Sequence, residues 1–490
     1  MKKIKKNTSL NSNLESVTRR DLFERTGTLL QGTALAWILG SGVSSEKFAR
    51  ASAPATYDLS PKKPHVEPKA TAVIQLFMHG GPSQVDLFDP KPMLNKYAGK
   101  IPTRDLTTDI TSPLESGGLL PSPFQFSKHG QSGMELSELL PHLATCVDDI
   151  ALVRSMYGEH FNHEPAIFHM HSGRTVPNRP TMGSWIAYGL GTENRNLPAY
   201  VVLDDPKNLP TNGISNWQSA WLPPIYQGTR FRSEGPPVLN LESRPELPKP
   251  LLEAQKQLLR DLDKNHLREH SNDSYLEGRI ASYELAARMQ IAASDALDIS
   301  KESKQTQKMY GLDQPETASY GKRCLMARRL VEQGVRFVQL YIEDQIWDAH
   351  SNLEDSLNYS CKKTDQPVSA LLKDLKDRGL LDSTLVVWGG EFGRLPLSQT
   401  GPTKISGRDH GPSGFSVWMA GGGIKGGTVY GSTDQFGHKA LENRVSVHDF
   451  HATILHLLGM NFRSLTYERH GLQERLTDQF PARVVSEILS

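Results

Sequence analysis

The sequence predicts an α/β fold, a three-layer α/β/α sandwich built around a mainly parallel central sheet. Four short apolar runs have the length and composition of buried strands, at residues 72–78, 335–342, 384–388 and 415–419. Helix-forming segments precede the second and third runs, at residues 320–333 and 368–378. A helix that connects two strands of one sheet makes a parallel crossover, so we expect helices on both faces of the sheet.

The ends of the predicted helices carry start and stop signals. Pro367 marks the expected start of the helix before the third strand, and Gly379 follows its end. A last helix is predicted over residues 447–458, with Ser446 as its N-cap and Gly459 just past its end. Each predicted element therefore has defined boundaries.

A long, charged and helix-prone segment covers residues 247–310 and carries an apolar stripe that includes Leu258, Leu259 and Leu262. This spacing predicts amphipathic helices, which we interpret as a helical insertion beside the sheet. The length of 490 residues suits one large domain with insertions, or two domains. We expect one α/β domain over residues 65–485.

The composition excludes several classes of protein. Apolar residues make up 37% of the chain, and the mean hydropathy of -0.45 excludes a multispanning membrane protein. The 55 Lys and Arg residues nearly balance the 54 Asp and Glu residues, so no nucleic-acid partner is expected. Cys146, Cys324 and Cys361 are far apart, which argues against a disulfide framework or a zinc ribbon and allows at most one disulfide.

Residues 1–55 have the composition of an export signal followed by a linker. Lysines dominate the first six residues, Arg19 and Arg20 follow, an apolar run covers residues 29–39, and Ala51 and Ala53 offer a cleavage site. The paired arginines favour the twin-arginine export machinery, with an uncleaved amphipathic helix as the alternative. Because the apolar run is short, we predict an exported protein, periplasmic or extracellular, without a stable membrane span after signal removal.

Acidic and histidine side chains gather at the predicted strands, all four of which are expected to end at the same edge of the sheet. Ligands bind beyond the carboxyl ends of parallel strands, so these side chains are candidates for a metal site. Carboxylate and imidazole ligands together suit Zn²⁺ or Mn²⁺, and a paired site also suits Mg²⁺ or Ca²⁺. The alternative is that they cap helices and satisfy loop amides. The candidates are His79, Asp348, His350, Glu391, Asp409 and His410.

Several motifs resemble the family known as domain of unknown function 1501. They are HGGPSQVDLFDPKP, MHSGRTVPNRPTMGSWIAYGLG, WDAHSN, VVWGGEFGR, GRDHGP and HDFHATILHLLG, within residues 72–480. The order of elements also resembles the alkaline phosphatase superfamily, which includes phosphodiesterases, phosphoglycerate mutases and sulfatases. The resemblance implies an alkaline phosphatase-like α/β fold with divalent metal ions that act on a phosphate or sulfate ester.

Carried over residue by residue, the resemblance implies that Asp348, His350 and His410 are metal ligands. Glu391 keeps an acid at a ligand position, whereas Phe392 stands where the superfamily has a histidine. Glu391, together with a histidine, is then expected to contribute to a second metal.

His163 occupies the position, ten residues before Gly173, where related phosphodiesterases carry a Thr or Ser nucleophile. We expect His163 to be a metal ligand like His79, or a nucleophile or general base beside a metal-activated water. Arg394 is expected to hold the anion, with a loop-bracing salt bridge as the alternative. Cys324 lacks the proline of a sulfatase signature, so it is interpreted as a core residue.

These observations predict an exported, metal-dependent hydrolase-like protein that acts on a phosphate or sulfate ester through a metal-activated water. The substrate would be a small-molecule or polysaccharide ester. The alternative is a noncatalytic metal- or glycan-binding envelope protein that retains the fold.

Overall fold

A nine-stranded sheet forms the centre of the computed structural model, which describes residues 58–101, 117–235, 248–270, 274–399 and 406–490. Its strands follow the order β12-β4-β11-β8-β1-β7-β5-β6, with β15 beside β4. The strands are β1 Ala72–Phe77, β4 Ile150–Tyr157, β5 Tyr200–Leu203, β6 Thr229–Phe231, β7 Phe337–Tyr341, β8 Thr384–Gly389, β11 Phe415–Ala420, β12 Thr428–Tyr430 and β15 Val445–Ser446.

The sheet is parallel except for β11. β1 pairs in parallel with β7 and β8, whereas β11 runs antiparallel to both β8 and β4. The predicted mainly parallel sheet is therefore confirmed. The prediction that all four strands end at one edge is wrong for β11. Because β11 is reversed, its start lies at the edge where its neighbours end.

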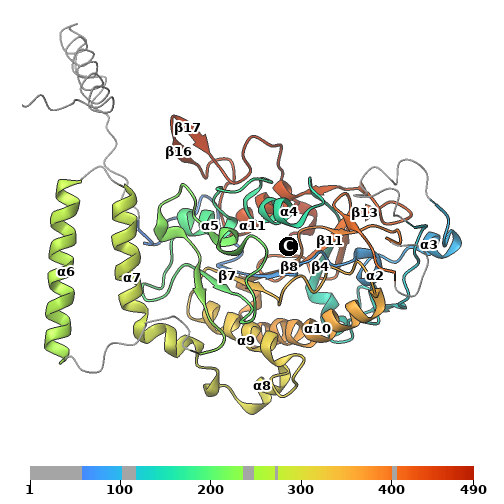
Figure 1. Ribbon diagram of the computed structural model, residues 1–490, viewed down its shortest axis with the longest axis horizontal. Coiled ribbons are helices and arrows are strands. Elements are labelled where there is room, and N and C mark those ends of the chain that lie inside the picture. Colours follow the sequence, from blue (N-terminus) through green and yellow to red (C-terminus); the bar gives the residue numbers. More distant parts are fainter. Residues whose placement is uncertain (1–57, 102–116, 236–247, 271–273, 400–405) are drawn as a thin grey trace, which may run out of the picture. The chain divides into compact units, whose positions relative to one another are not determined.

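Helices cover both faces of the sheet, which confirms the predicted α/β/α layers (Figure 1). The helices α9 and α10 lie on one face, and α4, α5 and α11 lie on the other. Apolar side chains of the strands and of these helices form one continuous core between the layers. The helices are α4 His163–Ser172, α5 Met182–Leu190, α9 Ala318–Glu332, α10 Leu353–Asp377 and α11 Val447–Leu457.

The predicted boundaries hold for α11 and fail for α10. The Ser446 hydroxyl accepts a hydrogen bond from the Asp449 amide, and the Asp449 carboxylate accepts one from the Ser446 amide, which is a capping box. The start predicted at Pro367 is wrong, since α10 already begins at Leu353. Buried side chains such as Leu357 continue through this helix, and their packing outweighs the hydrogen bond that proline cannot donate.

The long segment between β6 and β7 contains the helices α6 Lys249–Glu269 and α7 Ser274–Leu297. Leu258, Leu259 and Leu262 of α6 are exposed, whereas Ala293 and Ala296 of α7 are buried. The smaller elements are α2 Gln84–Leu87, α3 Pro92–Lys96, α8 Lys304–Met309, β2 Phe126–His129, β3 Met134–Ser137, β9 Gly393–Arg394, β10 His410–Gly411, β13 Ser432–Thr433, β14 Ala440–Glu442, β16 Tyr467–Arg469 and β17 Leu472–Glu474.

Two sequence predictions concern export and the cysteines. The predicted signal at residues 1–55 lies outside the described residues. None of the helices in the described residues combines the length and the apolar character needed to span a bilayer. Cys146, Cys324 and Cys361 are buried free thiols, which confirms the interpretation of Cys324 as a core residue.

Candidate metal centre

Five adjacent strands bring acidic and histidine side chains to one edge of the sheet. β4, β11, β8, β1 and β7 are consecutive in the sheet order, and all of them end at this edge except β11, which starts there. Chain segments far apart in sequence therefore meet beyond the same edge. They carry His163 after β4, His410 before β11, Glu391 after β8, His79 after β1, and Asp348 and His350 after β7.

Glycine lets the segments after β1 and β7 approach each other closely. Gly80 has a φ of +113°, and a Cβ on this residue would lie 2.6 Å from the backbone nitrogen of Asp348. Any other residue type would collide with the chain that carries Asp348, besides being strained at this φ. Glycine in the His-Gly-Gly sequence after β1 therefore allows the chain to place Asp348 at this position.

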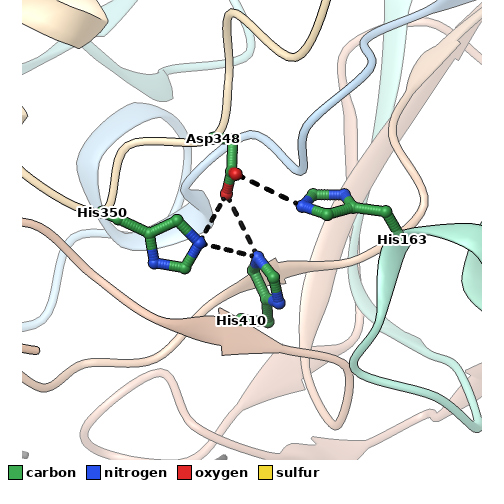
Figure 2. Close-up of side chains that lie close together, drawn as sticks. All are labelled: His163, Asp348, His350 and His410. Carbon is green, nitrogen blue, oxygen red and sulfur yellow. Dashed lines mark hydrogen bonds and ion pairs between the residues drawn. The ribbon is translucent and has the colours of Figure 1, made fainter. Parts of the chain in front are cut away.

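Asp348 is at the centre of a group of three imidazoles (Figure 2). Its Oδ1 lies 2.9 Å from Nε2 of His350 and 3.1 Å from Nε2 of His410, and its Oδ2 lies 3.4 Å from Nε2 of His163. The Nε2 atoms of His350 and His410 are 3.0 Å apart. One ligand atom from each of the four residues lies within 4.8 Å of the others.

This donor set fits a divalent transition metal. Three imidazole nitrogens and one carboxylate oxygen are typical zinc ligands. Two nitrogens bound to one tetrahedral zinc ion lie about 3.3 Å apart, given Zn–N bonds of about 2.05 Å. The spacing of 3.0 Å between His350 and His410 is close to this value. These two imidazoles therefore need little rearrangement to share an ion, and the ligand atoms of the other two residues lie within 4.8 Å of theirs.

The metal-centre cluster, defined as His163, Asp348, His350 and His410, is open to solvent on one side. The side chains of His163 and His410 are each 11% exposed and that of Asp348 is 19% exposed, whereas that of His350 is 34% exposed. A ligand or substrate would thus reach the cluster past His350.

A deeper group of side chains lies behind His163. Nδ1 of His163 is 2.6 Å from Oε1 of Glu391, and this oxygen also accepts a hydrogen bond from the Gly80 amide at 3.0 Å. His79 is fully buried, and its two ring nitrogens, like Oε2 of Glu391, have no hydrogen-bond partner among the described residues. The His79 and His163 ring centroids are 6.2 Å apart. Buried polar atoms without partners are rare, so this group has the character of a ligand set.

Burial and neighbouring charges determine the protonation of these side chains. Burial opposes a charge on His163, but its hydrogen bonds with Asp348 and Glu391 outweigh this effect and raise its pKa to about 9. Burial acts against the charge on Asp348 as well, but hydrogen bonds from three histidines hold its pKa far below the usual range. Burial lowers the pKa of His79 and of His410. At neutral pH, His163 must therefore lose a proton before it binds a metal.

The structure places Arg394 in a supporting position that differs from the anion contact expected for it. Its guanidinium is fully buried, and its three nitrogens bind backbone carbonyls of Gly81 at 2.9 Å, Arg408 at 3.1 Å and Trp347 at 3.2 Å, in addition to that of Gly80. It also forms an ion pair with Asp348. We therefore assign Arg394 to holding Asp348 and the turns around it.

Asp409 lies behind the cluster. Its Oδ1 accepts a hydrogen bond from the His410 amide at 2.8 Å and is 4.0 Å from Nδ1 of His350. Nδ1 of His350 is instead 2.5 Å from Oε1 of Gln399, a contact that the sequence does not predict. Gln399 and Asp409 are thus neighbours of ligand candidates, and neither belongs to the four-residue group.

Phe392 forms an apolar wall beside the cluster. Its ring centroid lies 4.6 Å from that of His410 and 5.0 Å from that of His163. It also fills the space next to Gly81, where a Cβ would lie 2.6 Å from the ring. The superfamily resemblance assigns a histidine to position 392. In this chain the phenyl ring at that position contacts two imidazoles of the cluster.

The fold and this cluster define an α/β protein with a candidate histidine–carboxylate metal centre at the sheet edge. A family model described as "Protein of unknown function (DUF1501)" matches residues 70–489, and the chain therefore belongs to this family. The family prediction made from the motifs is confirmed.

The remaining comparisons give distant likenesses. No curated protein sequence matches the chain significantly. Among solved structures, the PsFucS1 sulfatase from Pseudoalteromonas sp. is 12% identical, with a TM-score of 0.32, covering 80% of this chain and 68% of the other. The phosphonate monoester hydrolase SpPMH from Silicibacter pomeroyi is 11% identical, with a TM-score of 0.32 and 71% of each chain covered. The lipoteichoic acid synthase LtaP from Listeria monocytogenes is 9% identical, with a TM-score of 0.34, covering 85% of this chain and 78% of the other.

Proposed function

We propose that this protein is an exported, metal-dependent hydrolase of phosphate or sulfate esters. The observation that carries the proposal is the convergence of Asp348 with three imidazoles, with one ligand atom from each residue within 4.8 Å of the others. These side chains lie on segments next to three different strands of one sheet, β4, β7 and β11, and the cluster is open to solvent beside His350. The ester class is the one that the superfamily resemblance implies.

In this proposal Asp348, His350 and His410 hold the first divalent ion, and Glu391 with His79 or His163 contributes to a second. When bound, such an ion would supply Lewis-acid polarisation of the ester and activation of water. Zn²⁺ fits the imidazole-rich first set, and Mn²⁺, Mg²⁺ or Ca²⁺ fit a set with more carboxylate. Arg394 would act by holding Asp348 in place, since its donors already have partners.

His163 is the residue proposed for proton transfer. Its ring lies between the carboxylates of Asp348 and Glu391, which hold the orientation of both nitrogens. Because its pKa is raised to about 9, His163 carries a proton at neutral pH that it can give to a leaving group, and it can accept one from water once that proton is lost. The same position also allows a ligand role, and the two roles differ in the metal content of a His163→Gln variant.

The alternative function is a noncatalytic metal- or glycan-binding envelope protein. One observation favours it: Phe392 presents an apolar ring to His410 and His163 where the superfamily has a ligand. A protein that binds one ion and hydrolyses none of the esters would fit this function.

Metal analysis combined with an ester panel tests the proposal. The purified protein is expected to contain a divalent metal and to hydrolyse aryl phosphate or aryl sulfate esters, and His410→Ala should lose both. His456→Gln is a matched control because His456 is half-exposed on α11, outside the cluster. Full hydrolysis by His410→Ala without loss of metal would contradict the proposal, and metal without hydrolysis would favour the binding protein.

A further inference from the structure

A second group of potential ligands contains none of the residues used above. Glu159, His169 and His448 each place one ligand atom within 4.8 Å of the others. Glu159 lies on the segment between β4 and α4, His169 lies within α4, and His448 lies in the first turn of α11. His163 and His169 are six residues apart, so they project from α4 roughly 240° apart around the axis. One helix thus serves two groups through different faces.

The imidazole of His169 is buried, and one of its nitrogens has no hydrogen-bond partner within the described chain. Its residue is 3% exposed, and its Nε2 has no hydrogen-bond partner among the described residues. Buried polar atoms without partners are rare, so this nitrogen has the character of a ligand atom.

The position of His448 is typical of a metal-binding histidine. Its Nε2 lies 2.9 Å from the carbonyl oxygen of Gly173, and because a carbonyl only accepts hydrogen bonds, Nε2 carries the proton. A neutral ring then has its lone pair on Nδ1. A hydrogen bond from the second ring nitrogen to a backbone carbonyl is common among zinc-binding histidines. Phe480 stacks on the ring at a centroid distance of 4.5 Å and fixes its plane.

The charges around this group favour a cation. Glu159, Asp449 and Asp478 all act to raise the pKa of His448, although burial lowers it overall. Arg174 and Arg179 are the opposing charges nearby, and both pair with Asp478, at 3.0 Å and 3.2 Å. The three acidic side chains therefore outnumber these two guanidinium groups.

We propose that Glu159, His169 and His448 form a second metal site, separate from the metal-centre cluster, that binds Zn²⁺. Two histidines and one glutamate make a known three-ligand zinc set, which leaves a fourth position for water or a ligand. Glu159 is exposed, so its carboxylate has the freedom to move from within 4.8 Å to the spacing of about 3.3 Å that one ion requires.

Occupation of this site would fix the segment that precedes α4. Glu159 lies four residues before His163, and His448 is already joined to Gly173 at the other end of α4. An ion held by Glu159, His169 and His448 would therefore connect both ends of α4 to α11. The expected consequence is a more stable protein in which His163 keeps a constant position relative to the sheet edge.

Zinc titration in a background without the first cluster tests this inference. The full chain with His350→Ala, His410→Ala and Glu391→Gln, which lacks ligands of both ions of the proposed function, is stripped with a chelator and titrated with Zn²⁺ against a chromophoric competitor. We expect this variant to bind about one equivalent of Zn²⁺ in the titration, and the bound Zn²⁺ to raise its thermal unfolding midpoint. Adding Glu159→Gln should weaken this binding at least about tenfold, and adding His448→Asn should also weaken it.

Two matched variants show where the remaining zinc binds. Glu164→Gln changes another exposed glutamate, in the first turn of α4, and should leave the binding unchanged. His270→Gln tests the exposed group His266, Glu269 and His270 at the end of α6, the other described set with suitable spacing. The inference is overturned if the background binds no zinc. It is equally overturned if Glu159→Gln and His448→Asn leave the binding intact, or if His270→Gln abolishes it.

Discussion

Glu391 and Asp348 hold the imidazole of His163 between them, with Oε1 of Glu391 2.6 Å from Nδ1 and Oδ2 of Asp348 3.4 Å from Nε2. Glu391 follows β8 and Asp348 follows β7, and the side chain of Glu391 is completely buried. A carboxylate on the outer nitrogen fixes the tautomer and orientation of a metal-binding histidine. Glu391 therefore directs Nε2 of His163 toward the metal-centre cluster.

The first prediction concerns Glu391→Gln. The amide keeps the size of the side chain and removes the charge that fixes His163, so metal affinity should fall by about 10- to 100-fold. Competition titration with a chelator measures the affinity. Glu354→Gln, an exposed glutamate in the first turn of α10, is the control and should bind metal as the unmodified chain does. Equal affinities for the two variants would contradict the prediction.

The second prediction concerns Arg394→Lys. Arg394 donates to carbonyl oxygens on several segments, and one ammonium group cannot reach all of them. The buried acceptors that lose their partner should lower the free energy of unfolding by about 3 kcal/mol or more. Denaturant unfolding of the metal-free protein measures this loss. Arg195→Lys, at an exposed position, should change it by less than about 0.5 kcal/mol. A similar small change for Arg394→Lys would show that its contacts are replaceable.

Much of the sheet can be predicted because its strands are continuous apolar runs. β1 and β7 fall within the predicted ranges, β8 and β11 extend one residue beyond theirs, and the capping signals predict α11 to within one residue. β4 is absent from the predicted set, although its first four residues are equally apolar. The reversal of β11 was not predictable from the local sequence pattern. The direction of a strand depends on the strands with which it pairs, and the sequence of a six-residue apolar strand is the same type in either direction.

For the candidate site, too, the sequence predicts some features and not others. Asp348, His350 and His410 were predicted as ligands because they flank strands, and the structure brings them together. Whether they bind a metal remains a prediction. The supporting role of Arg394 and the contact of Gln399 with His350 depend on which loops meet in space. No spacing rule along the chain contains that information.

The third prediction concerns acid stability. Burial lowers the pKa of His169, His171 and His451 to about 3, whereas the unfolded chain binds protons at each histidine below about pH 6.5. The unfolded state thus binds more protons between pH 6.5 and 3. The contribution of these neutral histidines to the free energy of unfolding is fully present above pH 6.5. As the pH decreases through this range, it should fall by up to roughly 1.4 kcal/mol per pH unit for each histidine.

The slope of stability against pH tests this prediction in a His451→Gln variant. The amide can still donate to the Met170 carbonyl, which Nε2 of His451 contacts at 2.8 Å, but it takes up no proton. Between pH 6 and 4 the slope should become shallower by roughly 1 kcal/mol per pH unit. His456→Gln on the same helix is the control. An unchanged slope for His451→Gln would show that this residue is not held neutral.

The fourth prediction concerns export. Lysine at both positions 19 and 20 should stop export by the twin-arginine machinery, because that machinery recognises the arginine pair. Cell fractionation should then find the uncleaved precursor in the cytoplasm. Arg25→Lys, in the same segment, should be exported normally. Export of the Arg19→Lys, Arg20→Lys double variant at the normal level would contradict the twin-arginine assignment.

The fifth prediction uses Phe392, whose ring lies 4.6 Å from that of His410 and 5.0 Å from that of His163. An imidazole at this position would bring one more nitrogen donor to the cluster, as the superfamily resemblance suggests. Phe392→His should therefore bind Zn²⁺ at least about tenfold more tightly, or bind one additional equivalent. Phe392→Leu keeps an apolar side chain and controls for repacking against Gly81. If both variants bind zinc as the unmodified chain does, position 392 does not face a metal, and the ligand set must be completed from the side of His79 and Glu391.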